Sequence, residues 1–222
     1  MLDINEQQIK WGKEVKRGYL KWPDENVIRF MNRSFRENKN NIKVLDLGCG
    51  AGRNTVALME EGFQLYACDY SKECIEVTRN RCEKFKDSKV KIKQNSSTDI
   101  PIKDNQLDSV VACGSLFYNN LQDRKLIMLN INRILKKGGV FWANWRSTED
   151  SMYKKGKEIE RNFYMLDTDG REGLAYYFAT IEDLKELYNY AGFEIYNIEK
   201  SEFITNNLKE KSSWYHISAK KI

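Results

Sequence analysis

The sequence has no closely spaced cysteine pair and almost no histidine, and both absences limit its chemistry. The five cysteines are an odd number and form no C-x-x-C pair, so neither a disulfide framework nor a cysteine-based zinc site is indicated. The single histidine, His216, excludes zinc sites that need two histidines and leaves one residue for any Ser/Cys–His triad. We expect no bound metal, a cytoplasmic location, and reduced thiols at Cys49, Cys68, Cys74, Cys82 and Cys113.

Long apolar runs, targeting signals and a strong charge are also missing. No stretch approaches the roughly 18 uninterrupted apolar residues of a membrane span, and residues 1–6 (MLDINE) lack the basic-then-apolar pattern of a secretory signal. The net charge of +5 is a mild surplus, whereas duplex-binding surfaces are usually strongly basic. We therefore expect neither a membrane nor a nucleic acid as partner.

What the sequence does contain is an alternation of strand-like and helix-like segments. The strand-like runs are 42–47, 63–69, 90–94, 107–113 and 140–145, and the helix-like segments between them are 54–61, 72–86 and 121–135. Gly138-Gly139 is expected to stop the last of these helices. The alternation predicts right-handed β-α-β units and a doubly wound, mostly parallel α/β sheet with helices on both faces.

The regular alternation of strand-like and helix-like segments ends after Trp145. Residues 151–162 are predicted to be helical, 165–173 turn-rich and 181–190 helical, and 193–204 and 214–222 are predicted to form an antiparallel hairpin that completes a seven-stranded sheet. Two amphipathic helices, about 6–16 and 24–36, precede the first strand. We expect a single domain over 1–222, made of an N-terminal helical lid (1–40), a cofactor-binding core (41–145), a substrate-side insertion (146–180) and a terminal helix with hairpin (181–222).

The most informative stretch runs from Val44 to Asn54, where an apolar strand leads through G-x-G-x-G into a helix. Glycines allow a sharp turn and let a ligand lie against the backbone. Twenty-one residues after Gly48, the second strand ends in Asp69, which in a doubly wound fold lies beside the loop and can accept both ribose hydroxyls. Together these features predict a nucleoside cofactor site.

Two cofactor classes share this topology. Dinucleotide dehydrogenases prefer G-x-G-x-x-G, but Asn54-Thr55 stands where the third glycine is sought. The pattern Asp46-x-Gly48-x-Gly50-x-Gly52 instead resembles motif I of the class I S-adenosylmethionine-dependent methyltransferases. The stretches 67–71 (ACDYS), 97–108 (STDIPIKDNQLD) and 187–193, ending AGF, resemble further motifs of that family, so the resemblance covers about residues 40–222.

The resemblance implies S-adenosylmethionine as cofactor and S-adenosylhomocysteine as product. The family often has an acid at the position of Ser96, so contact with adenine falls here to the Ser96 or Thr98 hydroxyl and to the backbone near Ser97. Tyr70 is either a platform for adenine or a surface tyrosine. The cofactor-binding residues implied are Asp46, Gly48, Cys49, Gly50, Arg53, Asp69, Tyr70, Ser97, Thr98 and Cys113.

Methyl transfer from a sulfonium is an in-line displacement that needs positioning more than a catalytic triad. The one candidate catalytic side chain is Tyr118, which either orients the acceptor by a hydrogen bond or packs against neighbouring side chains. Cys113 is better read as a small buried strand residue, because Ala112 replaces the proline that precedes the cysteine of RNA cytosine-C5 methyltransferases. The Asn/Asp-Pro-Pro-aromatic signature of base-amino methyltransferases is also missing after strand four, and His216 is favoured as a structural residue.

We predict transfer to an O or N atom of a small polar metabolite, such as a sugar or sugar-linked compound. The insertion 146–180 carries many aromatics, which either line a pocket, with Arg146 and Tyr176 as acceptor contacts, or pack onto the sheet with Phe163 and Phe178 in the core. Tyr19 and Trp22 are lid candidates over the methionine moiety, the alternative being simple docking of an apolar helix. A non-catalytic cofactor-binding or regulatory module is the alternative function, and a dehydrogenase is a distant third.

Overall fold

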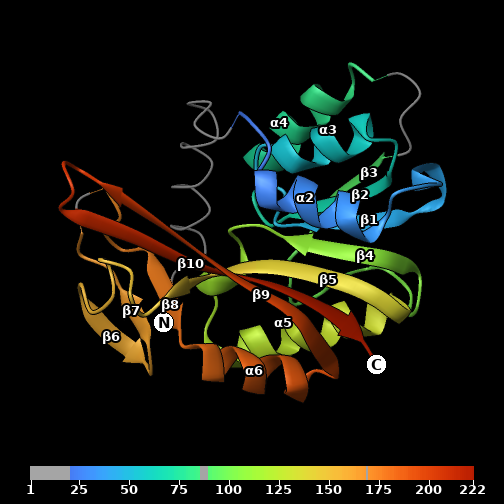
Figure 1. Ribbon diagram of the computed structural model, residues 1–222. Coiled ribbons are helices and arrows are strands. Elements are labelled where there is room, and N and C mark those ends of the chain that lie inside the picture. Colours follow the sequence, from blue (N-terminus) through green and yellow to red (C-terminus); the bar gives the residue numbers. More distant parts are fainter. Residues whose placement is uncertain (1–20, 86–89, 169) are drawn as a thin grey trace.

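The computed structural model describes residues 21–85, 90–168 and 170–222, and its centre is a twisted sheet with helices on both faces (Figure 1). Five strands run parallel in the order β3-β2-β1-β4-β5, and β10 and β9 follow antiparallel beside β5. This confirms the doubly wound prediction, and β3 lies at an edge of the sheet. The strands are β1 (Lys43–Leu47), β2 (Gln64–Asp69), β3 (Val90–Gln94), β4 (Leu107–Ala112), β5 (Leu135–Ser147), β9 (Phe193–Thr205) and β10 (Glu210–Lys221).

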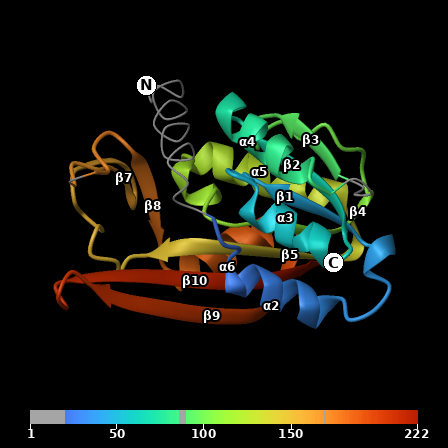
Figure 2. The same ribbon diagram turned by 90° about the horizontal axis from the view of Figure 1, so that it is seen from above.

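The helices divide between the two faces of the sheet (Figures 1 and 2). One face carries α2 (Glu25–Ser34), α3 (Arg53–Glu60) and α4 (Lys72–Cys82), and the other carries α5 (Leu121–Ile134) and α6 (Ile181–Tyr190). Neighbouring strand residues serve opposite cores, because successive side chains point to opposite faces. Phe141 packs in the α5–α6 core, for example, and Trp142 in the α2–α3 core.

Side-chain caps fix where several helices begin. Asp24 accepts a hydrogen bond from the backbone N–H of Asn26 at the start of α2, and Thr180 forms a capping box with Asp183 at the start of α6. At the end of α5 the prediction is wrong: β5 begins at Leu135, directly after the helix, so the two glycines at 138–139 lie inside the strand.

The described residues form a sheet of ten strands, where seven were predicted. The additional strands are β6 (Lys157–Glu160), β7 (Phe163–Met165) and β8 (Ala175–Ala179), and β8 joins the end of β5 in parallel. The helix predicted over 151–162 is wrong. Gly156 has φ +101°, and a Cβ there would lie 2.1 Å from the carbonyl oxygen of Met165, so the chain turns at this point and enters β6.

The N-terminal predictions have a mixed outcome. The helix predicted over 24–36 is confirmed as α2, whereas the helix at 6–16 and the lid residue Tyr19 lie outside the described residues. None of the helices in the described ranges has the length and apolar character needed to cross a membrane.

Candidate cofactor and acceptor site

The glycine loop joins β1 to α3, and the space around its three glycines, Gly48, Gly50 and Gly52, differs. All three have positive φ, between 54° and 73°. A Cβ at Gly48 would lie 2.4 Å from the Cβ of Ser115, and one at Gly52 would lie 2.8 Å from the side chain of Thr78. At Gly50, in contrast, nothing lies within 4 Å of that position. Packing therefore requires Gly48 and Gly52, while Gly50 borders open space that a ligand can fill.

Asp69, at the carboxyl end of β2, lies against this loop as the sequence predicts. Its Oδ2 accepts a hydrogen bond from the backbone N–H of Gly50, and its Oδ1 accepts one from Ser71, both at 2.9 Å. Burial raises the pKa of the carboxyl group, and these two hydrogen bonds oppose that effect. The Cys74 side chain and the Tyr70 backbone also hydrogen-bond to this carboxyl group and lower its pKa.

Asp46 plays a different part from the one implied by the motif alone. The side chain is buried and accepts a 2.6 Å hydrogen bond from Thr55 Oγ1, which ties β1 to α3. Burial raises the pKa of Asp46 to about 6, although the Thr55 hydrogen bond and the charge of Arg53 lower it. In this structure Asp46 therefore stabilises the glycine loop by joining the strand before it to the helix after it.

The residues expected near adenine gather at the carboxyl ends of β2 and β3. Asn95 continues the strand pairing by donating to the carbonyl of Asp69 at 3.0 Å. The Ser96 and Thr98 hydroxyls, 2.7 Å apart, bond to each other, and the Thr98 backbone N–H also donates to Ser96 Oγ. Tyr70 and Ser97 are half-buried in the same region. The topology thus brings together the four residues that the sequence analysis singled out.

Cys113 follows directly after β4 and belongs to a cluster that sequence reasoning missed in part. Its thiol donates to Asp24 Oδ2 at 3.5 Å, and Arg53 Nη2 donates to its sulfur at 3.4 Å. Arg53 and Asp24 also form an ion pair at 3.6 Å. Burial raises the pKa of the Cys113 thiol, so this group is not an activated nucleophile. The one sequence feature that could have drawn attention to Asp24 is its position as the N-cap of α2.

Asn144, on β5, is a second polar residue that the sequence analysis missed. Its Oδ1 accepts a 2.6 Å hydrogen bond from the backbone N–H of Gly114, and it faces His216 of β10 in the strand register. His216 Nε2 shares a 2.7 Å hydrogen bond with Ser201 Oγ, and its ring stacks on Trp142. Burial lowers the pKa of His216. These contacts describe a histidine that packs within the hairpin.

Arg146 and Tyr176, the predicted acceptor contacts, form a packed arginine–aromatic cluster with three other residues. Arg146 Nη1 donates to Asp150 Oδ2 at 2.6 Å, and its guanidinium lies 4.1 Å from the ring centroid of Trp214. Tyr176 is buried, and Tyr118 contacts its ring edge-on at a centroid distance of 5.0 Å. The cluster comprises Arg146, Phe117, Tyr118, Tyr176 and Trp214.

The structure therefore favours packing for these side chains over direct acceptor contact. Burial raises the pKa of Tyr118 far above its usual range, so its hydroxyl stays protonated. Phe163 and Phe178 are buried, as predicted. Within the described part of the chain, the Nε of Arg146 is the one donor of the cluster that is buried without a hydrogen-bond partner.

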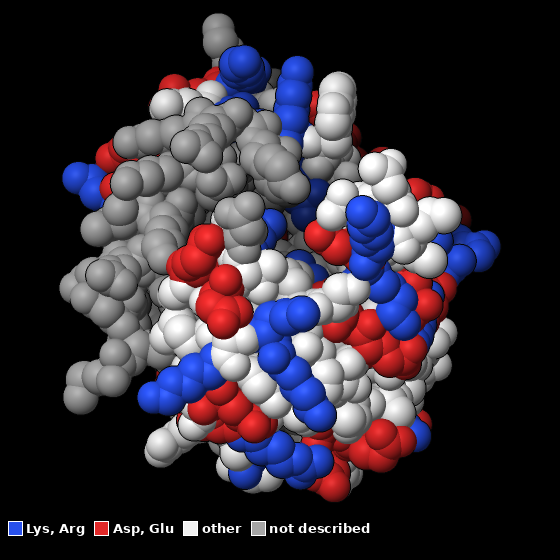
Figure 3. All heavy atoms as spheres, turned by 90° about the vertical axis from the view of Figure 1, so that its left-hand side faces the viewer, with Lys and Arg blue, Asp and Glu red and all other residues white. Residues whose placement is uncertain are grey.

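Trp22, the other lid candidate, is 74% exposed in this structure. Its carbonyl oxygen accepts a 3.2 Å hydrogen bond from Arg53 Nη1, which places the segment beside the glycine loop. The indole itself does not close over the site here, and closure by Trp22 or Tyr19 stays a prediction. Figure 3 shows the end of the molecule that faces left in Figure 1, where basic and acidic side chains are interspersed over the described surface.

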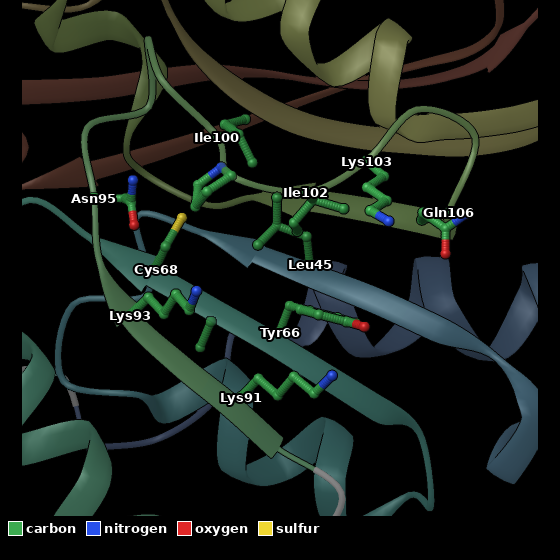
Figure 4. Close-up of a pocket in the computed structure, with 12 residues that line it drawn as sticks. Leu45, Tyr66, Cys68, Lys91, Lys93, Asn95, Ile100, Ile102, Lys103 and Gln106 are labelled. Carbon is green, nitrogen blue, oxygen red and sulfur yellow. The ribbon is translucent and has the colours of Figure 1, made fainter.

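A separate cavity of about 270 Å³ lies between the segment 95–106 and one face of β1, β2 and β3 (Figure 4). That segment forms no helix, so a loop covers this part of the sheet face. Tyr66 and three lysines, Lys91, Lys93 and Lys103, line the cavity, and Lys91 Nζ lies 5.4 Å from the Tyr66 ring centroid. None of the loop glycines borders it, so it is distinct from the cofactor cradle.

A parallel sheet whose first strand leads through an open glycine loop beside a second-strand carboxylate defines a Rossmann-like nucleoside-binding domain. Residues 44–139 match the family described as "Methyltransferase domain". A solved S-adenosylmethionine-dependent methyltransferase from Methanosarcina mazei superposes with a TM-score of 0.71 at 20% identity, covering 81% of this chain and 92% of that one. Residues 44–139 are thus similar to a methyltransferase family, and the fold is that of a solved S-adenosylmethionine-dependent methyltransferase.

Two curated relatives show how varied the acceptors of such proteins are. The tRNA N(3)-cytidine methyltransferase METTL6 of Mus musculus is 28% identical over 73% of this chain and 59% of its own length. The demethylmenaquinone methyltransferase of Geobacillus sp. (strain WCH70) is also 28% identical, over 55% of this chain and 50% of its own. The chain thus spans between half and three-fifths of the length of these two relatives.

Proposed function

We propose that this protein transfers the methyl group of S-adenosylmethionine to an O or N atom of a small polar metabolite. The observation that carries the proposal is the open cradle formed by Gly50 and Asp69 at the carboxyl edge of the parallel strands. Ligands of open α/β sheets bind at that edge.

The residues present fit this cofactor. No atom lies within 4 Å of a Cβ position at Gly50 or at Gly114, so both backbone segments leave room for a ligand. Asp69, which lies against the open side of the loop at Gly50, would hold the ribose hydroxyls. Tyr70, Ser97 and Thr98 would surround adenine. When bound, the cofactor supplies a methyl group already activated by the sulfonium, so the chain has mainly to bind, orient and exclude water.

The acceptor would approach from the side of Asp24, Arg53 and Asn144, which lie around the end of β4. Asp24 and Arg53 neutralise each other through their ion pair, which suits a polar acceptor without a large net charge. The interspersed charges of the described surface in Figure 3 are unlike the basic stripe of a duplex-binding protein. Both observations support a small metabolite.

An RNA is the second candidate acceptor, favoured by the match with the tRNA methyltransferase over 172 residues. The experiment uses S-adenosylmethionine labelled in the methyl group, incubated with the protein and either a fractionated metabolite pool or total tRNA. Label in a low-molecular-weight product supports the proposal, and label only in tRNA replaces it. Calorimetric binding of S-adenosylhomocysteine without transfer to either pool would indicate the non-catalytic binding module.

A further inference from the structure

The strand β9 forms the sheet edge opposite β3 and has a single strand partner. It is 13 residues long and pairs only with β10 among the described residues. Figure 2 shows β9 as the outermost strand on its side of the sheet. Unpaired N–H and C=O groups along such an edge are a template for another strand, and natural proteins usually shorten or interrupt such edges. β9 contains no proline, and its one register shift against β10, at Tyr196, lies near the beginning of the strand.

Exposed apolar side chains accompany this open edge. Tyr196, Ile198, Phe203, Ile204 and Leu208 are between 40% and 81% exposed. The tip of the hairpin, which carries the last three, extends beyond the strands that pack beneath the rest of β9 (Figure 1). Single exposed apolar residues are normal on a protein surface, but several gathered along one edge indicate an interaction site.

The charges along β9 can pair between two copies when Lys200 faces Glu202, two residues that also pair within one copy at 3.0 Å. If two copies pair antiparallel with Ser201 opposite Ser201, Lys200 of each copy faces Glu202 of the other. Ile198 then faces Ile204, so the exposed apolar residues of the tip meet the body of the second copy. Centring the pair on residue 199, 200 or 202 would instead place two glutamates or two lysines face to face. Opposite-charge and apolar pairs stabilise facing strands, and like charges destabilise them.

We propose that β9 is a dimer interface, at which two copies of this chain pair antiparallel about a two-fold axis through Ser201. The interface is isologous, so each favourable contact occurs twice. On the α2 side, Glu199 is already held by Arg29 and Arg33, at 3.2 and 3.3 Å. The ring of Phe203 from the second copy faces Glu199 in this register and would lie beside those guanidinium groups.

Sedimentation velocity on the full chain tests the charge pairing. The wild type should sediment with a mass near twice the 26.2 kDa of one chain. Lys200→Glu or Glu202→Lys alone should weaken association at least tenfold, because each creates two like-charge pairs. The double variant with the two residues exchanged should restore the dimer. Lys185→Glu, on the exposed side of α6, makes the same charge change away from β9 and should leave the dimer intact.

A cysteine cross-link tests the register directly. Facing residues of antiparallel strands have Cα atoms about 4.5–5.5 Å apart, within the range that a disulfide spans. Ser201→Cys should therefore form a covalent dimer under mild oxidation, whereas Asn197→Cys, which would face Thr205, should not. A wild type that is monomeric at every concentration tested, a dimer unaffected by both charge reversals, or equal cross-linking of the two cysteine variants would overturn the proposal.

Discussion

Removing the carboxylate of Asp69 should separate its role in the cofactor site from its role in the fold. In the structure the group accepts two backbone hydrogen bonds of 2.9 Å, from Gly50 and Ser71, and it is buried. The Asp69→Ala variant loses these bonds and also the acceptor for the ribose hydroxyls. A hydrogen bond to a charged group contributes about 1.5–3 kcal/mol, which corresponds to roughly a 10- to 150-fold weaker Kd.

Folding should suffer less than binding. Two buried N–H groups lose their acceptor, at about 1–3 kcal/mol each if they stay dry, but the unfavourable burial of the carboxylate is removed at the same time. That burial is what raises the pKa of Asp69. We therefore expect a folded variant with a lower melting temperature, whose stability loss is smaller than the sum of the two lost bonds.

The assay is isothermal calorimetry with S-adenosylhomocysteine, which binds without turnover, alongside thermal unfolding of the free protein. Asp99→Ala provides a matched control, because Asp99 is an exposed aspartate in the neighbouring loop after β3. The control should keep its Kd within about twofold, the size of an ordinary surface effect. A folded Asp69→Ala protein with unchanged affinity would refute the assignment of Asp69 to the ribose.

Three further predictions follow from individual contacts. Gly48→Ala should destabilise the fold strongly because its Cβ would lie 2.4 Å from Ser115. Gly50→Ala should lower the stability by only about 1 kcal/mol and mainly weaken cofactor binding. Denaturant unfolding measures the first effect and calorimetry the second. Burial raises the pKa of Asp46 to about 6 from 3.8, so its contribution to stability is present below pH 3.8 and is lost as the pH rises through 6. Urea unfolding of wild type against Asp46→Asn from pH 4 to 7 should show a relative loss of about 2 kcal/mol in the wild type, and parallel curves would contradict it. Arg146→Ala leaves Asp150 buried without its cation and should lower the free energy of unfolding by about 3–5 kcal/mol, while Kd for the cofactor in the folded protein stays the same. A large binding defect at unchanged stability would show that Arg146 contributes to ligand binding.

The parallel core was predictable from the sequence because its signals are local. Each strand that runs into the cofactor edge is a short apolar segment bounded by turn residues, and each helix between them carries its own periodicity. The glycine loop and the carboxylate of Asp69 were predictable for a related reason. A doubly wound topology brings the ends of β1 and β2 to the same edge, so spacing along the chain becomes proximity in space.

The insertion after β5 was not predictable in the same way. Residues 157–160 are exposed and polar apart from Ile159, so they show no periodicity that separates a strand from a helix. Only pairing with β7, and the turn at Gly156, decides their conformation. These partners lie within eight residues of each other, so a short-range pairing that the periodicity does not reveal decides between helix and strand.

The sequence by itself determined the chemistry of the cofactor cradle, because glycines and a strand-end acid act through backbone conformation and local order. Tertiary structure alone decided what surrounds it. Asp24 and Cys113, 89 residues apart, meet beside Arg53, and Arg146 is enclosed by rings from three separate segments. Whether an arginine or a tyrosine faces a ligand or a packed core depends on which distant side chains fill the space around it, and that follows from the closed fold and not from the order of residues along the chain.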